Sequence, residues 1–136
     1  MLSSILKSTQ MGQLGIRSVL KTQISKDLQD TLSSQLKELD SIETEAHNIA
    51  SQRSWELPEL NPGVKLMTDM MTRGTMLYDG TDSRAAGMMI RGNTRGVIKS
   101  IQNLHHYHQQ DYQITALSQK LLDCENASIR QMEDYL

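Results

Sequence analysis

The sequence predicts an all-α protein that folds as an up-down-up-down four-helix bundle with a short N-terminal arm. Apolar residues recur every three or four positions over long stretches, which is the spacing of an amphipathic helix. The chain of 136 residues contains only 2 prolines and no phenylalanine, and it is rich in leucine, methionine and glutamine. Short connections between the periodic segments favour antiparallel neighbours. We expect a single domain over residues 1–136.

The first 53 residues are expected to form the arm and one long helix. A brief apolar pattern in residues 1–12 is interrupted by Gly12 and Gly15, so this part is expected to be an arm. From about 13 to 53 the apolar residues keep helical spacing and no proline intervenes, which predicts one helix. These apolar residues are Ile16, Leu20, Ile24, Leu28, Leu32, Leu36, Leu39, Ile42, Ala46 and Ile49.

Three further helices are expected in the remainder of the chain. Asn61 is suited to cap a helix over 62–79, with Pro62 at the first helical position, where its missing N–H has no consequence. A third helix over 82–108 follows a glycine and a run of capping residues. The fourth helix covers 111–135 and extends to the end of the chain.

Composition narrows the class of partner and the compartment. The net charge of −2 gives no reason to expect nucleic acid as a partner. No stretch approaches the roughly 18 consecutive apolar residues of a membrane span, so no membrane is expected. Cys124 is the only cysteine and the first residues lack the pattern of a secretory signal, so we expect a cytoplasmic protein.

The stretch LHHYHQQD (104–111) contains three of the 4 histidines. On a helix, His105 and His108 lie on the side of Leu104, which is expected to face the core, whereas His106 lies on the far side. Two interpretations remain open. Imidazoles are favourable at a helix C-terminus, where they meet the dipole and unpaired carbonyls, and they are also metal ligands.

The metal interpretation needs ligands from other helices. An up-down-up-down bundle would bring Glu43, His47 and Asp69 to the same end as His105 and His108. Such a set of His and carboxylate ligands suits a divalent metal such as zinc, iron or manganese. The chain has no Glu-x-x-His motif, so a di-iron oxidase or an iron store is disfavoured.

Glu125 is expected at the edge of the core, because it shares a helix face with Ile114, Leu117 and Met132. A carboxylate there requires a cation or hydrogen bonds, and Arg73 and Arg91 are the expected partners. A structural ion pair is the main interpretation. Catalysis with Glu125 as acid or base is a weaker alternative.

The segment AAGMMIRGNTRG (85–96) places Gly92 and Gly96 on a strip of small residues with Ala85 and Asn103. This strip lies opposite the apolar seam of Val97 and Ile101. Glycine weakens a helix, so its presence indicates close approach of another backbone. The strip is therefore expected to contact a neighbouring helix or a second subunit, and a homo-oligomer is expected.

A basic stripe runs along the same helix and consists of Arg84, Arg91, Arg95 and Lys99. Four charges at helical spacing are usually a solvated face with local ion pairs. Binding of an anion or an acidic partner is the alternative. Nucleic acid is not expected, since aromatic residues are not interleaved with the charges.

Three stretches carry a resemblance to a known group: MGQLGIRSVLKTQ (11–23), GMMIRGNTRGVIKSI (87–101) and ITALSQKLLDCENASIRQMEDYL (114–136). With these stretches the chain resembles ferritin-like four-helix proteins, in particular small spore-coat-type and uncharacterised ferritin-like proteins of Gram-positive bacteria. The resemblance implies the bundle architecture. The di-iron ligands of ferritin-like oxidases have no matching positions here, so no catalytic residue is carried over.

These observations favour a non-enzymatic bundle protein with a structural or protein-interaction role, acting as a homo-oligomer or with a protein partner. The alternative is a metal-binding bundle with the His and carboxylate site at one end.

Overall fold

The protein is all-helical over the part that the computed structural model describes, which is residues 1–58, 81–106 and 111–136. The four helices of these ranges are α1 (Leu2–Leu20), α2 (Lys26–Gln52), α4 (Asp82–His106) and α5 (Tyr112–Glu133). No strand occurs in these ranges, and none of these helices is long and apolar enough to cross a membrane. The predicted all-α four-helix bundle is confirmed.

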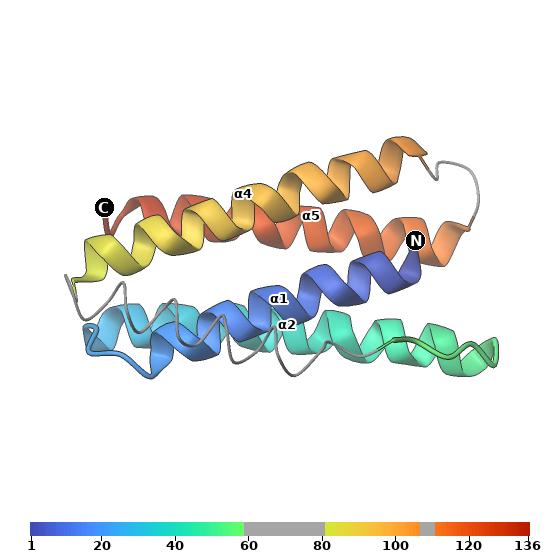
Figure 1. Ribbon diagram of the computed structural model, residues 1–136, viewed down its shortest axis with the longest axis horizontal. Helices are drawn as coiled ribbons and strands as arrows, with labels where there is room; N and C mark the ends of the chain where they lie inside the picture. Colours follow the sequence, from blue (N-terminus) through green and yellow to red (C-terminus); the bar gives the residue numbers. More distant parts are fainter. Residues whose placement is uncertain (59–80, 107–110) are drawn as a thin grey trace.

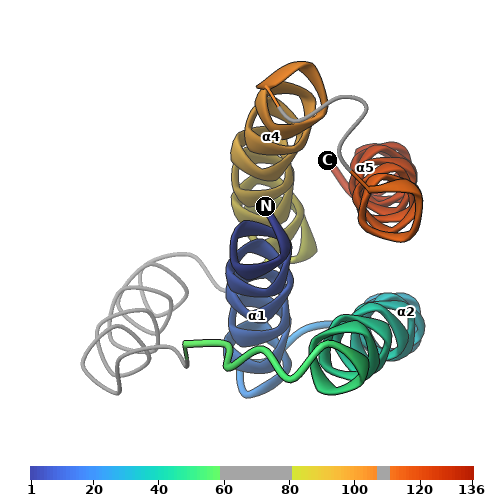
Figure 2. The same cartoon turned by 90° about the vertical axis from the view of Figure 1, so that its right-hand side faces the viewer.

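The four helices pack as the corners of an elongated bundle (Figures 1 and 2). Helix α4 packs most closely on α5, and α1 on α2, while the α2–α5 contact joins the two pairs. Helices α2 and α4 lie at opposite corners, with α1 and α5 between them (Figure 2). Surfaces on α2 and on α4 therefore face different sides of the molecule.

Successive helices do not all run in opposite directions. Helix α2 is antiparallel to α1, and α5 is antiparallel to α4, but α2 and α4 run the same way (Figure 1). The up-down-up-down order was predicted for four helices that include one over 62–79. That segment lies outside the described residues.

The expected N-terminal arm is instead part of a helix, so that element of the prediction is wrong. Helix α1 begins at Leu2 and continues through both Gly12 and Gly15. Leu2, Ile5 and Leu6 are buried in the core, which supplies the stabilisation that the glycines remove. A Cβ on Gly12 would lie 3.0 Å from Leu39 Cδ1, so this glycine allows α1 and α2 to approach each other.

The long helix expected over 13–53 is two helices, separated by residues 21–25. Helix α2 begins where Ser25 acts as N-cap, its Oγ accepting a hydrogen bond from the Leu28 N–H at 3.1 Å. The Ser25 N–H in turn donates to Asp82 Oδ1 at 2.9 Å, which ties the turn to the start of α4. The apolar spacing passes through this turn unchanged, so periodicity alone did not reveal the break.

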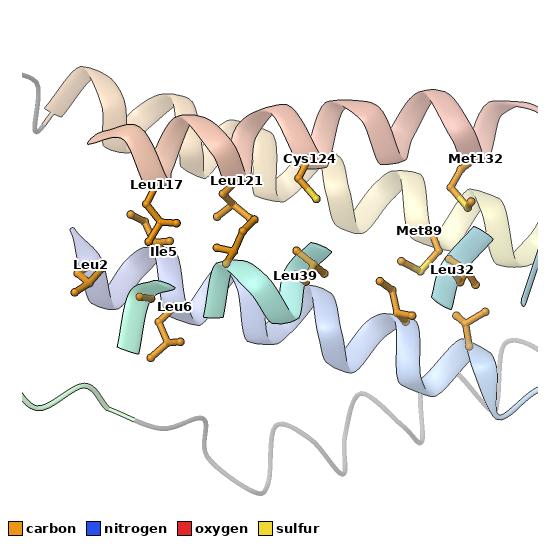
Figure 3. Packing of buried hydrophobic residues seen from close by; sticks show 14 of the residues in the cluster. Leu2, Ile5, Leu6, Leu32, Leu39, Met89, Leu117, Leu121, Cys124 and Met132 are labelled. Atoms are coloured by element: carbon orange, nitrogen blue, oxygen red, sulfur yellow. The ribbon is translucent and has the colours of Figure 1, made fainter. Parts of the chain in front are cut away.

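The core is a continuous apolar cluster from all four helices (Figure 3). In α2 the buried positions alternate by four and three residues, as in a coiled-coil seam. They are Leu28, Leu32, Gln35, Leu39, Ile42, Ala46 and Ile49, and Ala50 beside the last of them is buried as well. Gln35 occupies a core position, where its Nε2 donates to Gln131 Oε1 at 2.8 Å. The adjacent Leu36 is only partly buried against the cluster.

The orientation of α4 differs from the expectation. Its buried residues are Ala85, Ala86, Met89, Ser100 and Asn103, whereas Ile98 and Ile101 are exposed. Ile101 of the expected seam therefore faces outward while Val97 is half-buried, and Ala85, Gly96 and Asn103 of the small-residue strip face the bundle. Small side chains let α4 lie close against α5, and close packing requires such complementary volumes.

Candidate functional site

A buried carboxylate, Glu125, lies between α5 and α4. Its side chain is 5% exposed, and Ser100 Oγ donates a hydrogen bond to its Oε2 at 3.0 Å. Gly96 of α4 makes the space, because a Cβ at this position would lie 2.5 Å from Glu125 Oε1. Burial disfavours the charged form and raises the pKa of Glu125 to about 7, against the lowering effect of the Ser100 hydrogen bond.

The burial of Glu125 was predicted, but its expected ion pair with Arg91 is not formed. No salt bridge joins Glu125 to another described residue, and the Arg91 side chain is exposed. Arg73, the other expected partner, lies outside the described residues. Burial and the nearby Glu38, to whose Oε2 Cys124 Sγ donates at 3.4 Å, raise the pKa of Cys124 to about 12. Near neutral pH the Cys124 thiol is therefore protonated, whereas Glu125 is divided between its protonated and ionised forms.

Access to Glu125 is restricted. The two hollows described on the surface are lined by other residues, one between α2 and α5 and one near the start of α4. A general acid or base must come within hydrogen-bond reach of its substrate. Within the described ranges, the geometry favours a packing role for Glu125 over a catalytic one.

The expected metal ligands are separated where they can be placed. Glu43 is half-buried and its Oε2 accepts from Gln10 Nε2 at 3.2 Å, whereas His47 is exposed. His105 is exposed at the end of α4, at the opposite corner from α2 (Figure 2). Among residues 1–58, 81–106 and 111–136, no three His, Cys, Asp or Glu side chains form a group that would hold a metal. Asp69 and His108 lie outside these ranges.

The last residue of the histidine-rich stretch has a structural role. Asp111 is the N-cap of α5, and its Oδ1 accepts from the backbone N–H groups of Gln113 and Ile114 at 2.9 and 3.2 Å. It also forms a salt bridge with Arg53 at the end of α2. The Arg53 guanidinium, together with these backbone N–H groups, lowers the pKa of Asp111. The aspartate therefore fastens the start of α5 to the end of α2.

The two glycines expected at an interface have different surroundings. Gly96 faces the Glu125 carboxylate inside the same chain, so its close contact is between α4 and α5. Gly92 is exposed, and a Cβ there would meet nothing within 4 Å. Within the described structure, only Gly96 has the close approach that was expected of both.

The outer face of α4 combines exposed apolar and basic side chains. It consists of Arg91, Arg95, Ile98, Lys99 and Ile101. Ile98 is 53% exposed and Ile101 40%, values unusual for isoleucines of a stable bundle. No salt bridge or hydrogen bond joins the Arg91, Arg95 or Lys99 side chain to a described residue. The expected local ion pairs of the basic stripe are therefore missing at these three residues.

A hollow whose charge is opposite to that of the outer face of α4 lies between the start of α2 and the end of α5. This acidic hollow has a volume of about 520 Å³ and is lined by Asp27, Asp30, Thr31, Ser34, Gln131, Asp134 and Tyr135. Asp30 pairs with Lys26, and Asp27 Oδ2 accepts from the Tyr135 hydroxyl at 2.7 Å. No salt bridge is formed by Asp27 or Asp134 within the described part of the chain.

The total charges of α2 and α4 are also opposite in sign. Helix α2 carries two basic and six acidic residues, whereas α4 carries four basic and one acidic. The formal charges are therefore −4 and +3, on helices at opposite corners of the bundle (Figure 2). The chain's small net charge of −2 conceals this polarity.

The spacing of apolar residues in α4 did not identify Ser100 or Ile98 as site residues. A second pattern was present: Ala86, Met89, Asn93, Gly96, Ser100 and Asn103 are spaced by alternate steps of three and four residues. This is the spacing of a buried seam, made here of small and polar side chains. Side-chain size, considered together with hydropathy, predicts that Ser100 is buried and Ile98 is exposed.

Comparison with known proteins adds no relative: no protein-family model, no curated protein and no solved structure matches this chain.

Proposed function

We propose that the protein is a non-enzymatic helical-bundle protein with a structural or protein-interaction role, and that the outer face of α4 is its contact surface. The observation that carries the proposal is the combination on this face of two exposed isoleucines with three basic side chains that lack described partners. Exposed apolar residues rimmed by polar ones mark protein interaction sites. A partner with an acidic surface would neutralise the basic stripe while covering Ile98 and Ile101.

The face of α4 that packs against the bundle supports the same proposal. Helix α4 meets α5 through small residues and through Gly96, whose contact is the Glu125 side chain. Ile98 and Ile101 are left on the outside, which gives this helix a second face suited to a partner.

The expected resemblance to ferritin-like proteins belongs to this proposal for architecture alone. It is supported only by the packing of the four described helices as a bundle (Figure 2). A structural role of the spore-coat type is part of the same expectation. The divalent-metal alternative has no support from the described positions of Glu43, His47 and His105.

Site-specific photo-crosslinking in producing cells tests the contact surface. A photoreactive amino acid at position 98 should give a discrete adduct, whereas one at Ala116, an exposed position on α5, should not. Adding Arg91→Glu and Arg95→Glu should remove the adduct at position 98. Equal yields at positions 98 and 116, or none at either, would refute the proposed contact surface.

A further inference from the structure

We infer that the partner of the outer face of α4 is a second copy of this chain, docked through its acidic hollow. This inference rests on the proposed function and names its partner. The two surfaces have opposite charge, both belong to the described structure, and they occur once each on every copy.

The basic surface is a regular row of side chains on one helix. Arg91, Arg95 and Lys99 follow one another at intervals of four residues, so their side chains form one row along α4. Ile98 and Ile101 lie beside this row and are largely exposed. A docked partner would gain both charge neutralisation and burial of two large apolar side chains.

The acidic surface is concave and complementary. Three carboxylates, those of Asp27, Asp30 and Asp134, line a hollow of about 520 Å³ with Tyr135 in its wall. Asp27 and Asp134 lack cationic partners in the described structure. An arginine entering the hollow would find carboxylate acceptors and an aromatic side chain, both of which suit a guanidinium.

The positions of the two surfaces exclude their meeting within one molecule. The hollow lies between α2 and α5, whereas α4 occupies the corner diagonal to α2 (Figure 2). Joining the face of one copy to the hollow of another uses two different surfaces, so the contact is head-to-tail. Repetition of such a contact builds a ring or a chain of subunits.

Two reciprocal charge reversals test the inference. In the first variant, Arg91→Glu and Arg95→Glu make the α4 face acidic; in the second, Asp30→Lys and Asp134→Lys make the hollow basic. Each variant alone opposes like charges, so sedimentation equilibrium at low salt should show association at least about 10-fold weaker than wild type. An equimolar mixture pairs opposite charges at every contact and should associate again.

Controls separate folding defects from lost association. All four positions are exposed, so circular dichroism should show wild-type helix content. Lys7→Glu, at an exposed position on α1, should leave association unchanged. A monomeric wild type, association of either variant at wild-type strength, or a mixture that stays monomeric would overturn the inference. An adduct between position 98 and a different protein would overturn it too, while leaving the proposed contact surface intact.

Discussion

Glu125 is the only carboxyl side chain among the buried residues of the described ranges. Its carboxyl group is buried without a described cation, and its neighbours in space are the Ser100 hydroxyl and the Gly96 backbone. The protonated acid fits this site better than the carboxylate does, because only the charged form loses a large solvation energy on burial. Folding and protonation of Glu125 are therefore linked.

The linkage predicts that stability falls as pH rises toward neutrality. Between about pH 4.5 and 7 the folded chain holds a proton that the unfolded chain has released, so the free energy of unfolding decreases through this window and then levels off. At about 1.4 kcal/mol for each pKa unit, the loss is on the order of 3 kcal/mol. Glu125→Gln should flatten this profile in urea unfolding at pH 5, 6, 7 and 8.

The exposed Glu133 on the same helix supplies the control for this measurement. Glu133→Gln should leave the pH profile of wild type in place, since its carboxylate is solvated in the folded protein. A Glu125→Gln profile as steep as that of wild type would mean that Glu125 titrates normally in the folded state.

The glycines of α4 allow a matched comparison of two neighbouring helical positions. Gly92→Ala enters open space, so it should raise the free energy of unfolding by about 0.5–1 kcal/mol through helix propensity. Gly96→Ala would place a methyl group on the Glu125 carboxylate, so α4 must move or the carboxyl group must leave Ser100. We expect it to be at least about 1 kcal/mol less stable than Gly92→Ala in chemical denaturation. Equal stability would show that Gly96 is not in close contact.

At the scale of the elements, the sequence predicted the buried faces of α2 and α5 well, because the large apolar residues of each helix lie on a single face. Leu28, Leu32, Leu39 and Ile42 are all buried, as expected. The predicted orientation of α4 was wrong because this helix has two candidate buried faces, one apolar and one of small residues. Only packing against α5 decides between the two faces. Hydropathy measures transfer from water and does not report how closely two backbones approach.

The break between α1 and α2 depends on a capping signal rather than on periodicity. Ser25 followed by Asp27 and Leu28 is an acceptable helix start that the unbroken apolar spacing obscured. Ser25→Ala should lower the free energy of unfolding by about 0.5–2 kcal/mol, because the Leu28 N–H loses its acceptor. Ser33→Ala, at an exposed position inside α2, should be neutral or slightly stabilising in thermal unfolding. If both variants behave alike, Ser25 is not a functioning cap.

At the scale of the whole molecule, the architecture was predictable and the arrangement of its surfaces was not. The metal hypothesis assumed that the ends of α2 and α4 meet, but the two helices occupy opposite corners (Figure 2). The same diagonal arrangement separates the acidic α2 from the basic α4 and gives the molecule two complementary sides. Such a relation depends on which helices are neighbours, and local sequence does not contain that information.

The orientation of α4 underlies both the contact surface and the proposed partner, and cysteine accessibility measures it directly. At a concentration where the protein is monomeric, Ile98→Cys and Ile101→Cys should be alkylated nearly as fast as in the unfolded chain. Ser100→Cys, at a position only 2% exposed, should react only when the protein unfolds, as should the native buried Cys124. Rapid alkylation at position 100 together with protection at position 98 would contradict this orientation of α4 and the proposals that depend on it.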